Sequence, residues 1–387
     1  MLRKVVYAGA QSSSFVQATK DLEALAEARV SRERVQRWTK RVGQERLRDV
    51  QRQAEAYQSL PLPQRRTSPT DHVPQTACVM TDGGRIQVRK RREDQRDAQG
   101  YWKESLVGCC LSMVSGEHAA DPCPTIPKTF VDPARMHALS REIKGFSGSA
   151  DGEAQAPPDS PDDRQGRPET LVRSVVASRA GPDAFGKRLA AEAYARGFHA
   201  AERKAFVADG AATNWAIHRA HFSHYTPILD FTHAICYVYA AAIAGRTDDA
   251  AWRDYVQWAQ WLWEGSTAAL IAAVEARSTR LGPPPDGDET SPAAVVARTL
   301  GYLNNQRARM NYAAYRRLGL PITSSHIEST IKQINRRVKG TEKFWDRGAE
   351  SMLQLAADHL SETPTLPRFW RQRRRQLPTT RCYQTAG

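Results

Sequence analysis

The 387-residue sequence has no long hydrophobic run. Its apolar stretches fall well short of the ~20 residues that a membrane-spanning helix needs, and the opening MLRKVVYAGAQSS has too short an apolar core for a signal peptide. The chain has only six cysteines, and no two of them are spaced as C-x-x-C. This argues against a zinc cluster or a disulfide framework. We therefore expect a cytoplasmic protein without a membrane partner.

Acidic residues are also in deficit. Asp and Glu number 42 against 56 Lys and Arg, which gives a formal net charge of +14. Such an excess favours a polyanionic partner, nucleic acid ahead of an acidic membrane surface. The length predicts two or three domains with a substantial core.

The stretch from Leu318 to Asp346 predicts one helix with two distinct faces. Pro321 and the pair Ser324-Ser325 are helix-start signals. An apolar stripe at three- and four-residue steps follows, formed by Ile327, Ile331, Ile334 and Val338. A second line beside it starts with an acid and continues with polar and basic residues: Glu328, Lys332, Asn335 and Lys339, with Arg336 and Arg337 close by. Glu328 has two interpretations, a capping box with Ser325 or a metal-binding acid.

Three predicted strands run into an aspartate. The strand at 77–80 leads into Thr81-Asp82-Gly83-Gly84, where the glycine pair predicts a hairpin, so Asp82 is either a turn residue or a strand-end acid. The strand at 205–208 ends at Asp209, and the strand at 225–229 ends at Asp230, which is followed at the third position by His233. Asp209 and Asp230 are rivals for the second acid, and we rank Asp209 first. A further strand is predicted at 105–114.

Residues 15–42 predict a helix, a short turn and a second helix. Apolar residues have helical spacing from Phe15 to Ala26, and Val30-Ser31 makes a break with a good N-cap before the next stripe. The second helix carries the cations that a recognition helix would present to DNA, namely Arg32, Arg34, Arg37, Lys40 and Arg41. A helical hairpin with a solvated basic face is the alternative.

Composition divides the chain into six parts. They are a helical segment at 1–60, a proline-rich linker at 61–74, an α/β core at 75–245 with a flexible insertion at 145–168, a tryptophan-rich helical region at 246–311, the last part of the core at 312–363, and a basic tail at 364–387. We interpret the tryptophans as core residues. The tail is either a DNA-contacting segment or a disordered end.

A set of residues around Glu328 matches one family pattern: Tyr312-x-x-Tyr315-Arg316, Gly319-Leu320-Pro321-Ile322, Ser324-Ser325, Ile327-Glu328-Ser329, Lys332, Arg337, Lys339 and Trp345. This set resembles the third catalytic block of bacterial insertion-sequence transposases of the DDE class. Asp209-Gly210-Ala211, with Trp215 after it, is similar to the second block of that family. Asp230 and His233 resemble an accessory block that follows it.

The resemblance implies an RNase H-like mixed sheet flanked by helices, with a helical insertion before the catalytic glutamate and a helix-turn-helix-like segment at the N-terminus. It implies that Asp82, Asp209 and Glu328 are the catalytic, metal-binding acids, with Asp230 and His233 accessory. It further implies contacts with double-stranded DNA by the cations of that segment, Arg32, Arg34, Arg37, Lys40 and Arg41, and by Lys332, Arg336, Arg337 and Lys339.

The cofactor expected from such oxygen ligands is Mg²⁺ or Mn²⁺, as two ions, with no small-molecule cofactor. The expected activity is cleavage of transposon-end DNA and its transfer into target DNA by a homo-oligomer. Two alternatives stay open. One is a transposase-derived DNA-binding protein without catalysis, and the other is an RNase H-like nuclease that does not join strands.

Overall fold

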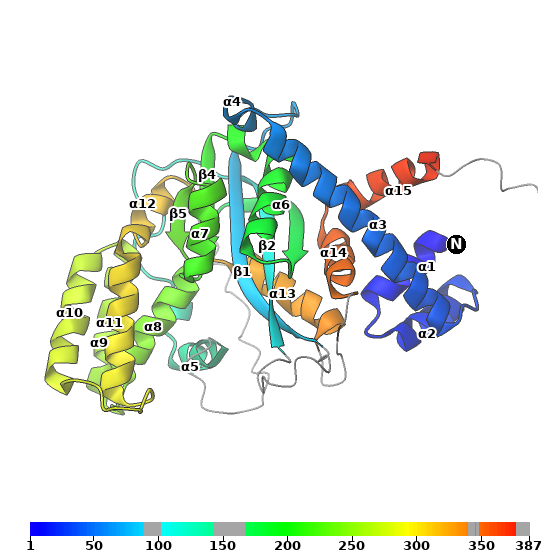
Figure 1. Ribbon diagram of the computed structural model, residues 1–387. Helices are drawn as coiled ribbons and strands as arrows, with labels where there is room; N and C mark the ends of the chain where they lie inside the picture. The colour runs from blue at the N-terminus through cyan, green and yellow to red at the C-terminus, as the bar shows by residue number, and fades with distance from the viewer. Residues whose placement is uncertain (89–101, 143–166, 340–344, 346–347, 377–387) are drawn as a thin grey trace, which may run out of the picture.

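The computed structural model describes residues 1–88, 102–142, 167–339, 345 and 348–376. Within them, one mixed sheet lies at the centre with helices on both faces (Figure 1). Its spatial order is β3-β2-β1-β4-β5. In chain order the strands are β1 (Thr76–Gln87), β2 (Trp102–Val114), β3 (Glu169–Ser178), β4 (Arg203–Ala208) and β5 (Thr226–Leu229). The predicted α/β class, a mixed sheet flanked by helices, is confirmed.

The hairpin predicted at Gly83-Gly84 is wrong. β1 and β2 pair antiparallel without interruption from Thr76 opposite Met113 to Gln87 opposite Trp102, so the glycine pair lies inside one long strand. Neither glycine has the positive φ that a tight two-residue hairpin requires. The local turn signal is overridden by the partner strand along the whole length of β1.

The sequence prediction also missed β3. Its run Thr170-Leu171-Val172 and the later Val175-Val176 are typical of a strand, but they directly follow the polar region that we interpreted as an insertion. Most of that region, residues 143–166, lies outside the described residues. β3 pairs antiparallel with β2 and completes the sheet on that side.

Each face of the sheet is covered by helices. Consecutive residues of β2 point to opposite faces: a Cβ on Gly108 would contact Leu189 of α6 (Pro182–Ala195), whereas Cys109 Sγ donates to Thr330 Oγ1 of α13 (Ser325–Val338) at 3.4 Å. α7 (Ala212–His221) packs against β4, and α14 (Ala349–Leu360) packs against β3 and α13.

The N-terminal segment contains the predicted helix, turn and helix, preceded by another helix. These are α1 (Leu2–Gln11), α2 (Phe15–Ala26) and α3 (Arg32–Ser59), and Ser31 caps α3 by accepting from Arg34 N. α3 has 28 residues and is longer than expected, because its last turns belong to the main core. Tyr57 is buried there and its hydroxyl lies 3.4 Å from His199 Nε2. The linker contains one short helix, α4 (Leu62–Arg65).

The tryptophan-rich region is helical, as predicted. The region forms α9 (Asp249–Glu264), α10 (Thr267–Leu281) and α11 (Pro292–Gln306), followed by the 3-10 turn η5 (Arg307–Arg309). Two helices of the core, α5 (Pro133–Glu142) and α8 (Phe231–Ile243), precede it in the chain, and α12 (Tyr312–Arg317) follows it. Trp258 and Trp263 are buried in the main core, which confirms the interpretation of these tryptophans as core residues.

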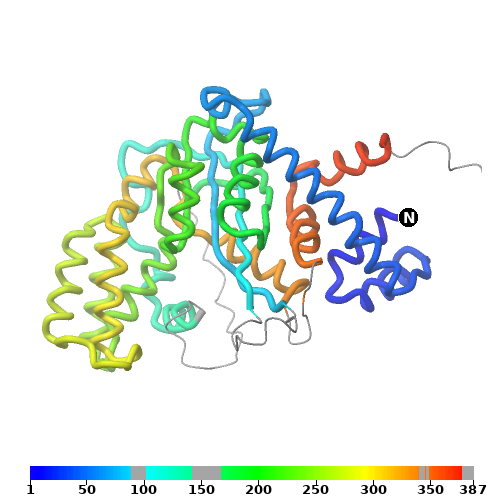
Figure 2. Tube along the Cα trace, in the orientation of Figure 1, coloured from blue at the N-terminus to red at the C-terminus, as the bar shows by residue number. Residues whose placement is uncertain are grey.

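Twelve residues of the basic tail form α15 (Thr365–Gln376). Leu366, Phe369 and Trp370 pack with α1 and with Val42 of α3, so the two ends of the described chain lie together (Figure 2). A disordered end is therefore wrong for this part of the tail. Among the described residues, no helix is both long enough and apolar enough to cross a membrane.

Candidate active site

Three aspartates lie side by side at one edge of the sheet. In the parallel ladders of β1, β4 and β5, Thr81 pairs with Ala208, and Ala208 pairs with Leu229. The next residue on each chain is an aspartate: Asp82, Asp209 and Asp230. Because neighbouring strands are about 4.8 Å apart, this register brings the three acids level with one another. The register is consistent with the expectation that Asp82 and Asp209 share one site, although Asp82 lies inside β1 and does not end it.

Glu328 is held against this edge by the start of α13. The N-cap of α13 is Ser324, whose backbone N–H donates to Asp230 Oδ1 at 2.7 Å. Because the helix starts at Ser325, Glu328 is the fourth helical residue, and the capping box with Ser325 is not formed. The capping interpretation of Glu328 is therefore wrong. As predicted, Ile327, Ile334 and Val338 are buried, with Ile331 half-buried at the cleft.

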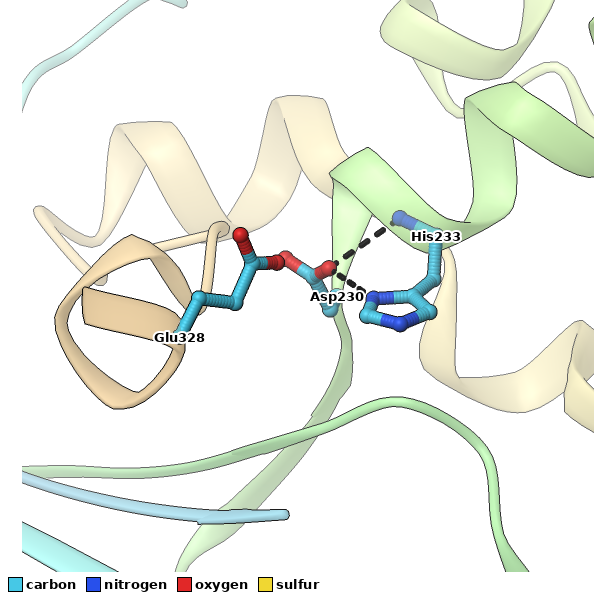
Figure 3. A group of neighbouring side chains, drawn as sticks. All are labelled: Asp230, His233 and Glu328. Carbon is cyan, nitrogen blue, oxygen red and sulfur yellow. Dashed lines mark hydrogen bonds and ion pairs between the residues drawn. The ribbon is translucent and has the colours of Figure 1, made fainter. Parts of the chain in front are cut away.

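Asp230, His233 and Glu328 form a compact group (Figure 3). One ligand atom from each lies within 4.8 Å of the other two, so the group could hold a metal ion. Asp230 is fully buried, and its Oδ2 accepts from His233 N at 3.0 Å and from His233 Nδ1 at 2.5 Å. Asp230 thus orients both the ring of His233 and the first turn of α13. This group differs from the expected metal-binding set, since it contains Glu328 but neither Asp82 nor Asp209.

The charges of this group are strongly coupled. Burial and the negative charge of Asp230 raise the pKa of Glu328 to about 7; Asp82 adds to this effect, while His233 and Lys332 oppose it. Burial alone would lower the pKa of His233, but the hydrogen bond and charge of Asp230, together with Asp209 and Glu328, raise it to about 9. The edge therefore has an excess of negative charge that a bound cation would neutralise.

A cleft of about 810 Å³ opens over these acids. Asp82, Asp209 and Glu328 line it, whereas Asp230 lies beneath its wall. The predicted polar line on α13 also faces this cleft, since its lining includes Lys332, Asn335 and Lys339. Carboxylates and cations in one cleft suit a phosphate-bearing substrate and its metal ions. All three acids that we ranked as catalytic therefore line the cleft, together with Glu104.

The loop after β4 holds Asp209 in a defined position. Asp209 Oδ1 accepts from Ala211 N at 3.0 Å and from Asn214 Nδ2 at 2.8 Å. Asn214 was not singled out in the sequence, although its place five residues after Asp209, at the start of a helix, was visible. Arg85, Trp102 and Glu104 also line the cleft without having been predicted.

The basic residues of α13 do not share one environment. Lys332, Arg336 and Lys339 are exposed, and Lys339 Nζ lies 5.6 Å from the ring centre of Trp102. Arg337 is 5 % exposed, and its Nε and Nη2 donate to Gly9 O of α1. The expectation that Arg337 meets DNA is therefore wrong: its guanidinium joins α13 to the N-terminal helices.

The cations predicted on α3 are at the surface. Arg32, Arg34, Arg37 and Arg41 are exposed, and Lys40 is half-buried. Two of them have acidic neighbours, since Arg32 pairs with Glu33 at 3.1 Å and Arg41 pairs with Glu45 at 3.3 Å. The first turns of α3 therefore present the predicted basic face.

Comparison of the sequence with protein-family models and with curated proteins gave no match to either.

The Asp230–His233 pair predicts a pH dependence of stability. A pKa raised from the ordinary ~6.5 of histidine to about 9 contributes stability that is complete below pH 6.5 and is lost as the pH rises through 9. In EDTA, the difference in Tm between wild type and His233→Gln should shrink from pH 6 to pH 9. Thermal unfolding followed by circular dichroism measures it. A difference that stays constant over this range would contradict the charged pair.

Proposed function

We propose that the chain is a DDE-class transposase with an RNase H-like core, which cleaves transposon-end DNA and transfers it into target DNA. The observation that carries this proposal is the alignment of Asp82 and Asp209 on neighbouring strands, in a cleft that Glu328 also lines. Further support comes from the strand order, in which an antiparallel three-strand unit continues into parallel β4 and β5.

In this proposal Asp82, Asp209 and Glu328 hold two divalent cations. Their oxygen-only ligand set fits Mg²⁺ or Mn²⁺, and the raised pKa of Glu328, caused by burial and by Asp230, fits a site that is complete only with cations. When bound, such ions would activate the attacking oxygen and stabilise the leaving oxygen in an in-line displacement at phosphorus. Water would attack the scissile phosphorus and displace the 3′ ester oxygen, which leaves as a 3′-hydroxyl while the phosphate stays on the 5′ end. This 3′-hydroxyl would then attack a target phosphodiester and displace the 3′ oxygen of the target strand, which takes up the proton.

The other residues of the cleft have separate roles in this proposal. Asp230 and His233 fix the start of α13 and so the carboxylate of Glu328. Lys332 and Lys339 line the cleft, where they would contact phosphates of the bound DNA. Action on two transposon ends by a homo-oligomer is part of the proposal and follows from the family resemblance alone.

The exposed cations of α3 are proposed to contact DNA phosphates. Replacing Arg34 and Arg37 with Gln should weaken DNA binding and lower the slope of log K against log salt by about 0.9 for each lost contact. Fluorescence anisotropy with labelled duplex DNA at several salt concentrations measures this slope. Lys187→Gln is the control, because Lys187 is a half-buried cation of α6, outside α3, and pairs with Asp183 of its own helix. An equal slope in the double variant and wild type would exclude α3 from the DNA interface.

A specific test of the whole proposal is DNA cleavage and strand transfer by the intact chain. A protein that binds DNA but neither cuts nor joins it, with metal present, would be a transposase-derived DNA-binding protein. One that cuts without joining would be a nuclease. Both outcomes reject the transposase proposal.

A further inference from the structure

One face of α11 and η5 lies against the loop that carries Asp209. Tyr302, Gln306 and Arg309 are spaced by four and three residues and so share a helical face. Tyr302 Oη donates to Asp209 O at 2.9 Å, and Gln306 Nε2 donates to Gly210 O at 3.1 Å. The guanidinium of Arg309 lies 4.4 Å from the ring centre of Trp215. Trp215 belongs to α7, the helix that follows the loop of Asp209.

The loop is closely fitted to this face. Gly210 has φ +99°, which side chains other than glycine rarely adopt, and a Cβ there would lie 2.9 Å from Tyr302 Cε2. Two consecutive carbonyls of the loop are thus held from outside by hydrogen bonds, and the aromatic ring fills the space beside them. The peptide that follows Asp209 has little freedom to rotate.

Tyr302 also joins this loop to the other half of the site. Its ring stacks on Tyr237 of α8, with the centroids 3.9 Å apart and the planes 9° apart. α8 begins directly after Asp230 and carries His233 in its first turn. Tyr302 therefore contacts both the loop that carries Asp209 and the helix that follows Asp230 and carries His233. It does so from the helical region that lies between Asp209 and Glu328 in the sequence.

We propose that Tyr302 and Gln306 are positioning residues that hold Asp209 in place for metal binding, so that the helical region formed by α9, α10 and α11 sets the metal affinity of the cleft. The inference rests on the proposed function, since it requires Asp209 to be a metal ligand. A ligand must be held within about 0.5 Å of its productive position. Outer partners that orient a ligand affect metal affinity by about 10- to 100-fold when they are removed.

The test uses Tyr302→Phe and Gln306→Met in the full chain. Tyr302→Phe retains the ring and its stacking and removes only the hydroxyl. Gln306→Met removes the amide, and with it the hydrogen bond that Gln306 Oε1 accepts from Arg309 Nη1 at 2.8 Å. We expect Mn²⁺ binding, measured without DNA by electron paramagnetic resonance, to weaken about 10-fold in each variant. DNA cleavage should then need more Mn²⁺ to reach half its maximal rate, while the rate at saturating Mn²⁺ stays close to that of wild type.

Tyr255→Phe is the matched control. Tyr255 is a buried tyrosine of α9 whose hydroxyl donates to a main-chain carbonyl, Phe130 O, at 2.5 Å. Tyr255→Phe should lower the Tm by about as much as Tyr302→Phe does and leave the Mn²⁺ affinity unchanged.

Unchanged Mn²⁺ affinity in both test variants, or an equal loss in Tyr255→Phe, overturns the positioning role while the proposed function stands. A wild-type protein that binds no Mn²⁺ overturns both. A wild-type protein that binds Mn²⁺ and cuts no DNA overturns the proposed function, and a loss of affinity in Tyr302→Phe then still supports the positioning role.

Discussion

Glu328→Gln should slow DNA cleavage about 10³-fold and leave DNA binding unchanged. The substitution retains the shape of the side chain and removes the negative charge that a cation needs. Metal ions contribute several kcal/mol of transition-state stabilisation, and ~4 kcal/mol corresponds to a rate loss of about 10³-fold. Single-turnover cleavage of end-bearing DNA measures the rate, and anisotropy measures binding. A variant that cuts within about 10-fold of wild type would contradict the role of Glu328.

The same variant should be more stable than wild type without metal. Burial and Asp230 raise the pKa of Glu328 from its ordinary ~4.3 to about 7. Such a carboxyl stabilises the fold below pH 4.3, and this contribution is lost as the pH rises through 7. In EDTA at pH 8, Glu328→Gln should therefore have the higher Tm, and the difference should vanish near pH 4.3. Loss of activity together with a gain of stability separates a catalytic role from misfolding.

The second large effect is expected at Arg46, which joins the N-terminal helices to the core. Arg46 is 2 % exposed; its Nε and Nη2 donate to Asp358 of α14 at 3.0 and 3.2 Å, and its Nη1 donates to Asp49 at 2.7 Å. Arg46→Ala leaves the buried carboxylate of Asp358 without its cation. Removing one partner of a buried ion pair lowers the free energy of unfolding by about 3–5 kcal/mol, which urea denaturation measures.

Arg52→Ala is the matched control for this prediction. Arg52 pairs with the same Asp49 at 3.3 Å, but its side chain is 63 % exposed. An exposed pair contributes about 0–1 kcal/mol, so this variant should unfold close to wild type. If Arg46→Ala were no more destabilising than Arg52→Ala, the buried cluster would not be what holds α3 on α14.

Local patterns predicted the elements that carry the site but not all of their pairing. The strands ending at Asp209 and Asp230 were predicted because short apolar runs stop at an acid. The position of Asp82 inside a long strand was not predicted. Gly83 and Gly84 pair with residues of β2 that are more than 20 positions away in the sequence. The same limit applies to β3, which was not predicted. Its apolar run directly follows a polar segment, and its pairing with β2 depends on residues far away in the sequence.

Contacts between distant elements could not be predicted at all. The spacing of Arg337 on α13 equally suits a surface cation, and only the packing of α1 against α13 shows that Gly9 O accepts from it. Tyr302 and Gln306 were part of a helical region known from composition alone, and nothing in their spacing indicated a bond to the loop of Asp209. Periodicity predicts which face is apolar, but not which loop lies against it.

The central claim is that the cleft lined by Asp82, Asp209 and Glu328 breaks and joins DNA with divalent cations. The most direct measurement incubates the intact chain with duplex DNA bearing the ends of its own element and with a target plasmid, in Mg²⁺, Mn²⁺ or EDTA. The account predicts 3′-hydroxyl ends and joined products with Mg²⁺ or Mn²⁺, and neither in EDTA. DNA that is bound but stays uncut with both metals, or that is cut equally in EDTA, would contradict it.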